Sequence, residues 1–326
     1  MALSEAFVDD HIATWSAKLK SPFFPHRKHW PHHLFHHAPL ENAVAILKDG
    51  CLRSRNDKDN SHPRDVAAPG VIDARSYAHD RVRLYFRPKT PTQYQIEGIR
   101  RKGECKFGDE THLPLLVMFC LDAKSVLLKP DIQFSNKNMQ IASASVGSDQ
   151  ASFSAIPFDK VYHEGSTSDK SVFDARCAEV MPSSPLKLEE CLHAILFRSH
   201  PEMETVLHRL GDDAEKWKPL CHVSDALKVF QKDYSFVSHL ELTTEGLEFR
   251  LNPRRDHGTV RLRARVTDEN DVASIDATYT AQPAKPKNGG NWIINKKHGQ
   301  GDYEITVWIE DQIAYNGIQT LQADLI

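Results

Sequence analysis

The feature that most constrains the fold is a change of pattern after about residue 234, where apolar and polar residues begin to alternate. The alternating segments are 240–242, 247–251, 260–266, 274–279 and 303–309, and turns rich in Gly, Asn, Asp and Pro separate them. Alternation puts every second side chain on one face of a strand, so several short segments of this kind predict a β-sandwich or barrel. We therefore predict a smaller, all-β, sandwich-like accessory domain over residues 234–326.

The preceding part mixes the two periodicities and predicts an α+β domain over residues 34–233, with a mixed β core and helices. A helix is expected from Leu40, with an apolar face that includes Ala43 and Leu47 and an end at Gly50. Further strands and one helix are expected at 83–86, 115–119, 177–181, 193–198 and 202–210. Residues 1–33 are expected to form an arm or cap, and residues 131–175 a long polar loop.

Charge restricts how this chain could meet a nucleic acid. The 326 residues carry a formal net charge of −3, so contact with phosphates requires a local basic surface. Residues 75–106 hold nine Lys and Arg against three Asp and Glu, and they are the best candidate for that surface. A solvated basic face is the alternative. In the β-rich region, Arg261, Arg263 and Arg265 share one strand face, for which a solvated face is the favoured interpretation.

The sequence indicates a cytoplasmic protein without membrane contact. No basic and apolar leader opens the chain, and no apolar run approaches the ~20 residues that span a bilayer. The six cysteines form no CxxC pair, which favours reduced thiols. The histidines between residues 26 and 37 lack the spacing and the partners of a metal site, so no metal is expected.

Three blocks could carry chemistry. His36 and His37 end a strand just before the helix from Leu40, where a small polar or anionic ligand can bind. Arg75, followed by a strand and a Tyr-Phe-x-Pro turn that begins at Tyr85, suits a diphosphate because its guanidinium donates two hydrogen bonds. Glu179 lies among small and apolar residues on an expected strand, where burial of a carboxylate is costly unless it is used. Taken singly, each block also has a purely structural explanation.

In this order, the three blocks resemble DarT, the NAD-dependent DNA ADP-ribosyltransferase toxins, over roughly residues 30–210. The resemblance implies NAD as co-substrate, Glu179 and Arg75 as catalytic residues, and His37 as a cofactor contact, with His36 as the alternative. Tyr85 and Leu52 would line the same pocket. The chain departs from the family in three places. His36 stands where a small hydroxyl residue is usual, the turn reads Arg87-Pro88-Lys89-Thr90-Pro91, and residues 235–326 have no counterpart in the short, single-domain DarT proteins.

If the resemblance holds, the acceptor is a base in a single strand, because a base nitrogen inside a duplex cannot reach the ribose without flipping. DNA is favoured and RNA is possible. The expected acceptor contacts come from the turn and from the loop 131–175, and they are Arg87, Lys89, Phe134, Lys137, Lys160 and Tyr162. For Phe153 and Phe158 of the same loop, a place in a small local core is at least as well supported.

The resemblance further implies a toxin in a toxin–antitoxin or phage-defence system, held in check by a cognate antitoxin, which in this family often carries a macrodomain. Two alternatives stay open on the residues alone. The chain could be a non-catalytic module that binds nucleic acid or a partner, or an ADP-ribosyltransferase that modifies protein.

Overall fold

The computed structural model describes residues 3–61, 64, 79–101, 103–105, 108, 112–139, 141–256, 258–281 and 292–322. These residues form two compact units. Unit 1 comprises 1–95, 117–196 and 224–230, and unit 2 comprises 96–116, 197–223 and 231–326. The chain therefore passes from one unit to the other several times.

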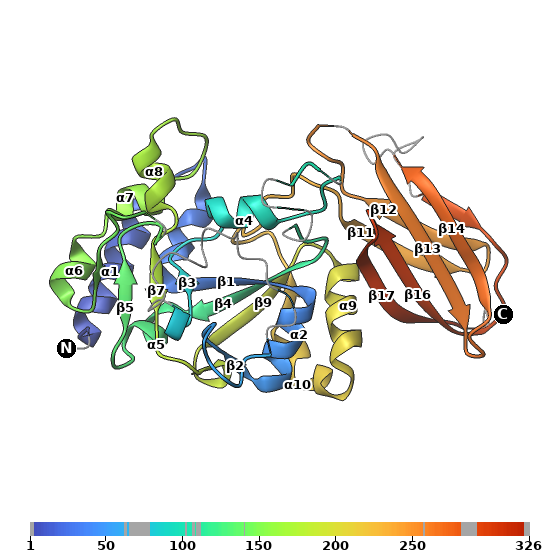
Figure 1. Cartoon of the computed structure of the whole chain (residues 1–326), viewed down its shortest axis with the longest axis horizontal. Helices are drawn as coiled ribbons and strands as arrows, with labels where there is room; N and C mark the ends of the chain where they lie inside the picture. Colours follow the sequence, from blue (N-terminus) through green and yellow to red (C-terminus); the bar gives the residue numbers. More distant parts are fainter. Residues whose placement is uncertain are drawn as a thin grey trace. The chain divides into compact units, whose positions relative to one another are not determined.

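Unit 1 is built on one sheet, in which the strands follow the order β9-β4-β1-β3-β7-β5-β6 (Figure 1). The strands are β1 (His33–Pro39), β3 (Leu84–Tyr85), β4 (Leu116–Asp122), β5 (Gln133–Ser135), β6 (Val146–Gly147), β7 (Glu179–Met181) and β9 (Leu192–Phe197). A separate two-stranded pair joins β2 (Cys51–Leu52) to β8 (Leu186–Lys187). The central strand β4 is buried from Leu116 to Leu121, as its continuous apolar run predicts.

Helix α2 (Leu40–Asp49) matches the expected helix, and Gly50 ends it with a φ of 71°, in the left-handed region that favours glycine. The other helices of this part of the chain are short, apart from the first. They are α1 (Glu5–Lys18), η1 (Pro25–His32), α4 (Pro91–Ile96), α5 (Ala123–Leu127), α6 (Gln150–Ser154), α7 (Phe158–Val161), α8 (Lys170–Ala175) and η4 (Leu188–Glu190).

One expectation for this part of the chain was wrong. Residues 131–175 are not a loop but two strands and three short helices, and Asp149 and Asp169 accept hydrogen bonds from the first turns of α6 and α8. Of the two forms expected for the first 33 residues, an arm or a cap, the packing of α1 against unit 1 favours the cap. His11 of α1 lies against the rings of Phe153 and Phe158, at centroid distances of 4.8 and 4.4 Å.

Unit 2 contains the predicted β-rich region as two antiparallel sheets, ordered β11-β12-β15 and β14-β13-β16-β17 (Figure 1). Their strands are β11 (Val237–Thr243), β12 (Gly246–Leu251), β13 (Val260–Asp268), β14 (Ala273–Ala281), β15 (Trp292–Asn295), β16 (Gly301–Ile309) and β17 (Gln312–Leu321). One core takes side chains from both sheets, including Leu247 and Phe249 from the first and Leu262 and Ile305 from the second. This shared core confirms the predicted sandwich.

Unit 2 also recruits earlier parts of the chain. It contains α9 (His200–Leu210), η5 (Gly211–Asp213), α10 (Ala214–Trp217), η6 (Lys218–Leu220) and β10 (Cys221–Val223). Ile99 belongs to the sandwich core, and Thr205 Oγ1 of α9 accepts the backbone N–H of Asn316 at 3.1 Å. These units therefore do not divide at the expected boundary near residue 234.

Two sequence expectations concern the surface and the thiols. Arg261, Arg263 and Arg265 form exposed ion pairs with aspartates, as a solvated strand face does. All six cysteines are free thiols, as expected. None of the helices in the described part of the chain combines the length and the apolar character that a membrane crossing requires.

Candidate active site

The middle of the unit 1 sheet brings together side chains that are far apart in the sequence. Tyr85 of β3 lies opposite Phe35 of β1 on one side and opposite Glu179 of β7 on the other. Residues directly opposite in an antiparallel pair project from the same face, and so do residues two apart along an extended chain. This register therefore places His37 and Arg83 on the face of Tyr85 and Glu179. The stacking of His37 on Tyr85 and the ion pair of Arg83 with Glu179 agree with this placement.

Glu179 is buried and forms an ion pair. The residue is 2% exposed, and its carboxylate accepts a hydrogen bond from Arg83 Nη2 at 2.7 Å and another from Arg83 Nε. Its backbone N–H donates to Ser135 Oγ at 3.1 Å. Burial alone would lower the pKa of Arg83, but the charge and the hydrogen bonds of Glu179 raise it above its usual value. Since a carboxylate offers about four acceptor positions, Arg83 leaves part of this capacity for a ligand.

A cavity of about 200 Å³ opens at the end of β1 and the start of α2. Its wall includes His36, His37, Asn42, Leu52 and Arg53. The wall forms because α2 follows β1 without a loop and the turn at the end of α2 leads directly into β2. The N-terminal turn of a helix beside the cavity favours a polar or anionic group there.

The two histidines contribute in different ways. The ring of His37 stacks on Tyr85, with centroids 5.5 Å apart and planes 8° from parallel, and burial lowers the pKa of His37 to about 3. His36 Nδ1 donates to the Arg83 carbonyl at 3.0 Å, and burial lowers its pKa as well. Both rings are therefore neutral at pH 7. Burial, and then the charge of Glu179, raises the pKa of Tyr85, so its hydroxyl keeps its proton.

The other expected cofactor contacts are Leu52, Arg75 and one of the two histidines. Leu52 is buried in the cavity wall, as the resemblance implies for a pocket residue. Arg75 lies outside the described residues, so its part in the site stays a prediction. The choice between His36 and His37 as the cofactor contact also stays open, because both line the cavity.

Three of the expected acceptor contacts are buried, which corrects the prediction that they face a nucleic acid. Phe134 packs against Phe153 at a centroid distance of 5.0 Å, and Tyr162 stacks on Phe158 at 5.7 Å. Arg87 is 2% exposed and donates to the carbonyls of Pro88 and His163. The local core considered for Phe153 and Phe158 is therefore real, and it includes these additional rings.

The three expected lysine contacts are only partly buried. Lys89 Nζ donates to Glu164 Oε1 at 3.1 Å, Lys137 Nζ to Ser143 Oγ at 3.4 Å, and Lys160 Nζ to Ser171 Oγ at 2.7 Å. Within the basic segment 75–106, Arg83 and Arg87 have internal partners, and a phosphate-contacting surface formed by the rest of the segment stays a prediction. Contact of these three lysines with a phosphate stays a prediction.

Sequence reasoning missed Arg83 as the partner of Glu179. The available signal was its position two residues before Tyr85, on the same face of the strand. It also missed Asn42, whose side chain exchanges two hydrogen bonds with the backbone of Arg64 at 2.8 and 2.9 Å and lines the cavity. The signal for Asn42 was an amide in the first turn of a helix that borders a pocket.

The histidines of residues 26–33 have separate partners. His26 contacts Glu164 at 2.5 Å, His32 lies 3.2 Å from Ser16 Oγ, and the ring of His33 packs on His193 with centroids 4.8 Å apart. Across the described ranges, no three His, Cys, Asp or Glu side chains converge as metal ligands do.

Comparison with known families adds an independent observation. The model of the family described as "ssDNA thymidine ADP-ribosyltransferase, DarT" matches residues 35–228. This range contains the cavity, the His37–Tyr85 stack and the Glu179–Arg83 pair. No curated protein matches the chain.

Solved structures include similar chains. Thermus sp. 2.9 DarT in complex with ADP-ribosylated ssDNA is 16% identical, with a TM-score of 0.51 over 60% of this chain and 96% of that one. The same Thermus protein in complex with NAD+ is 17% identical, with a TM-score of 0.48 over 60% and 97%. Thermosipho africanus DarTG in complex with ADP-ribose is 12% identical, with a TM-score of 0.47 over 68% and 55%. The first match shows a shared fold.

Proposed function

Because the DarT model matches more than half of its residues, this chain belongs to the DarT family of ssDNA thymidine ADP-ribosyltransferases, and we propose that Glu179, Arg83, Tyr85 and His37 form its transfer centre. The observation that carries the proposal is the register of β1, β3 and β7, which gathers these four side chains within the matched range. The cavity beside them would take NAD as co-substrate, with Leu52, Asn42 and either histidine as its contacts.

The buried carboxylate suits the chemistry of transfer. Departure of nicotinamide leaves positive charge on the ribose in the transition state, and a fixed negative charge in a water-poor site stabilises it. Glu179 supplies that charge, and Arg83 holds both carboxylate oxygens in place. The free acceptor capacity of Glu179 would orient a ribose hydroxyl.

The acceptor base must lose a proton during transfer. Thymine within DNA has one ring nitrogen that carries hydrogen, N3, since N1 is bonded to the sugar. Glu179 would accept the N3 proton while N3 bonds to C1′ of the ribose and nicotinamide leaves with the electrons of the broken bond. Water reaching the same carbon would give hydrolysis, so transfer requires the base to be held in place.

The neutral histidines and the protonated tyrosine fit the binding of a dinucleotide. An uncharged His37 stacked on Tyr85 presents a flat, apolar surface with hydrogen-bonding edges, and it does not repel the cationic nicotinamide ring. Arg75 is proposed to meet the diphosphate, on the strength of the family resemblance alone.

The test is transfer to defined acceptors. The chain is incubated with NAD and with single-stranded DNA, single-stranded RNA or lysate protein, and adducts are identified by mass spectrometry. We expect a thymidine adduct on DNA. Glu179→Gln should lower the rate at least about 100-fold, because it removes the charge and the base, and should keep the rise in melting temperature that NAD gives.

Glu245→Gln is the matched control, since Glu245 is an exposed carboxylate of unit 2. Transfer by Glu179→Gln at the wild-type rate would contradict the assignment. An adduct found only on RNA or only on protein would show that the acceptor is not DNA. A melting temperature that does not change with NAD would favour the non-catalytic binding module.

The biological setting is proposed from the family resemblance. An enzyme that attaches ADP-ribose to the DNA of its own cell harms that cell unless it is restrained. This supports a toxin with a cognate antitoxin of the macrodomain type, which removes ADP-ribose, and a role in phage defence. Co-expression with the neighbouring genes of its source would test this, because growth should be rescued by one of them only.

A further inference from the structure

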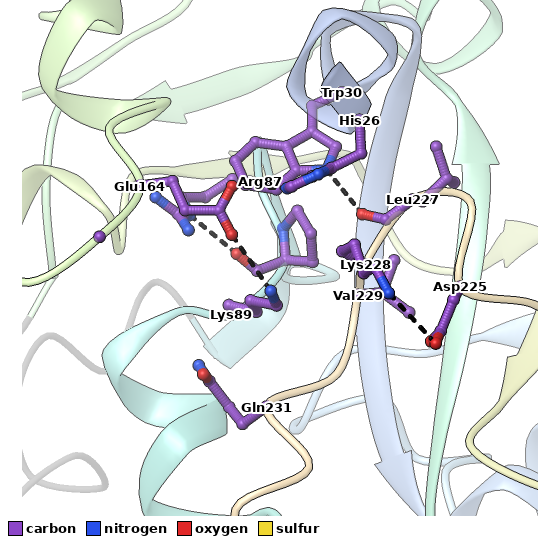
Figure 2. A network of polar contacts seen from close by, with 12 residues as sticks. His26, Trp30, Arg87, Lys89, Glu164, Asp225, Leu227, Lys228, Val229 and Gln231 are labelled. Carbon is purple, nitrogen blue, oxygen red and sulfur yellow. Dashed lines mark hydrogen bonds and ion pairs between the residues drawn. The ribbon is translucent and has the colours of Figure 1, made fainter. Parts of the chain in front are cut away.

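A second polar cluster in unit 1 holds more positive charge than its own carboxylate can balance. We call it the Glu164 cluster. Its cations are Arg27 of η1, Arg87 and Lys89 of the turn after β3, and Arg176 at the end of α8. Glu164 forms an ion pair with Lys89, and its charge also acts on the three arginines. Figure 2 shows Glu164 with Arg87 and Lys89. Four cations therefore share one carboxylate. Lys228, which Figure 2 also shows, is not counted because it forms its own ion pair with Asp225.

The contacts show how the single carboxylate is used. Glu164 binds His26 Nε2 at 2.5 Å and Lys89 Nζ at 3.1 Å, and Figure 2 shows its side chain beside Lys89 and Arg87. Arg176 and Arg87 instead donate to the carbonyl of His163, and Arg176 also donates to that of Gly165 at 2.6 Å. Peptide carbonyls orient these guanidinium groups but carry no net charge to neutralise them.

The electrostatic environment bears out this excess. Burial, and then the charge of Arg176, lowers the pKa of Arg87 to about 9. Burial also lowers the pKa of Arg27 and of Arg176. In the described part of the chain, the buried Arg27 Nε finds no hydrogen-bond partner. Buried cations normally have an anion beside them, so the arrangement is complete only when an additional anion binds.

Buried contacts hold the segments of the Glu164 cluster in place. Arg87 lies over the ring of Trp30 at 4.8 Å, and Trp30 Nε1 donates to the Leu227 carbonyl at 3.0 Å. These buried anchors hold η1, the turn after β3 and residues 163–165 together. The more accessible Arg27, Lys89 and Arg176 are thereby presented from three different segments.

Exposed aromatic rings accompany the cations. Phe23, three residues before His26, is 85% exposed, and Phe173, three residues before Arg176, is 48% exposed. Cations interspersed with open rings are typical of surfaces for single-stranded nucleic acid, where phosphates meet the cations and bases stack on the rings. A free phosphate has no base to stack on such rings.

We propose that the Glu164 cluster is a binding site for a backbone phosphate of the single-stranded DNA, with Arg27, Lys89 and Arg176 as its donors. This inference rests on the proposed function for the identity of the strand. Glu164 occupies part of the site and keeps Lys89 and His26 in position, so it competes with the phosphate for the same cations.

The test measures DNA affinity without NAD. A fluorescent thymidine oligonucleotide is titrated with the full chain at several salt concentrations. Arg176→Gln and Lys89→Met should each weaken binding by about threefold to tenfold and reduce the slope of log K against log salt by about 0.7, the value for one phosphate of a single strand. Glu164→Gln should tighten binding, which loss of a merely structural residue would not do.

Controls separate the sources of phosphate and the two proposals. Lys218→Met, an exposed lysine of unit 2, should leave the affinity and the salt slope unchanged. The affinity for NAD, measured calorimetrically, should be unchanged in all variants. Loss of NAD affinity instead of DNA affinity would assign the cluster to the NAD diphosphate, and unchanged DNA binding in Arg176→Gln and Lys89→Met would overturn the proposal. Because neither result depends on transfer, failure of the proposed enzyme activity is detected separately.

Discussion

At the scale of single residues, the ion pair of Arg83 with Glu179 is the contact on which the proposed centre depends. Arg83→Met would leave a buried carboxylate without its counter-charge, which typically costs about 3 kcal/mol. We expect a correspondingly lower free energy of unfolding in urea and loss of transfer. Arg83→Lys keeps the charge but not the bidentate geometry. Its free energy of unfolding and its transfer rate should lie between those of the wild type and of Arg83→Met.

The double variant Arg83→Met, Glu179→Met is the control, because it removes both charges and should recover much of the lost stability without recovering transfer. If the single and double variants were equally unstable, the pair would not be coupled as described.

The position of a residue was predictable where a motif carried it and unpredictable where burial decided it. His37, Tyr85 and Glu179 were singled out from their order in the chain, and the structure brings them to one face of the sheet, while their roles stay predictions. Arg83 and Arg87 look alike in sequence, since both are arginines in one basic segment. Only the pairing of β3 with β7 shows that Arg83 meets Glu179, and only the packing around Trp30 shows that Arg87 is internal.

At the scale of elements, long periodic segments were predicted well and short ones were not. Helix α2, strand β4 and the sandwich strands β11, β12, β13, β14 and β16 follow their patterns closely, whereas β15 and β17 were not expected. Helices α6, α7 and α8 have four to six residues, too few to show a helical period, and α1 has a weak apolar stripe because its buried face includes a histidine. These elements exist because tertiary contacts stabilise them, which a local pattern cannot report.

The buried histidine of α1 makes its packing sensitive to acid. Burial lowers the pKa of His11 to about 4, below the value of about 6.5 in an unfolded chain. The unfolded state therefore binds the proton first, and stability falls as the pH drops from about 6.5 toward 4. His11→Phe should reduce this loss, measured as the difference in unfolding free energy between pH 7.5 and pH 5. Equal pH dependence in both proteins would show that His11 is already solvated.

At the scale of the whole molecule, the predicted boundary near residue 234 stays a useful proposal for the start of the β-rich region, but the compact units cut the chain elsewhere. Ser199 Oγ donates to the Val237 carbonyl at 2.6 Å, and Tyr315 donates to Glu204 at 3.2 Å. The sequence pattern marks where apolar and polar residues begin to alternate. It cannot show that α9 and Ile99 share a core with strands that come much later.

We expect that a chain ending at residue 234 will not behave as an independent domain. It would expose Ile99 and the buried side of α9, including Val206, to water. Such a truncated chain should aggregate on size-exclusion chromatography or be cleaved rapidly by protease, whereas the full chain should not. A monodisperse, protease-resistant truncated protein would show that these segments are stable without the sandwich.

The interleaving of the two units has a consequence for synthesis on the ribosome. Unit 1 includes residues 224–230, where the carbonyls of Leu227 and Val229 accept hydrogen bonds from Trp30 and Gln93. Leu227 and Val229 are translated after all the residues of β1, β3 and β7. A nascent chain thus holds all the proposed catalytic side chains before it can close the framework around them, and the site is completed only after the ribosome has passed residue 230.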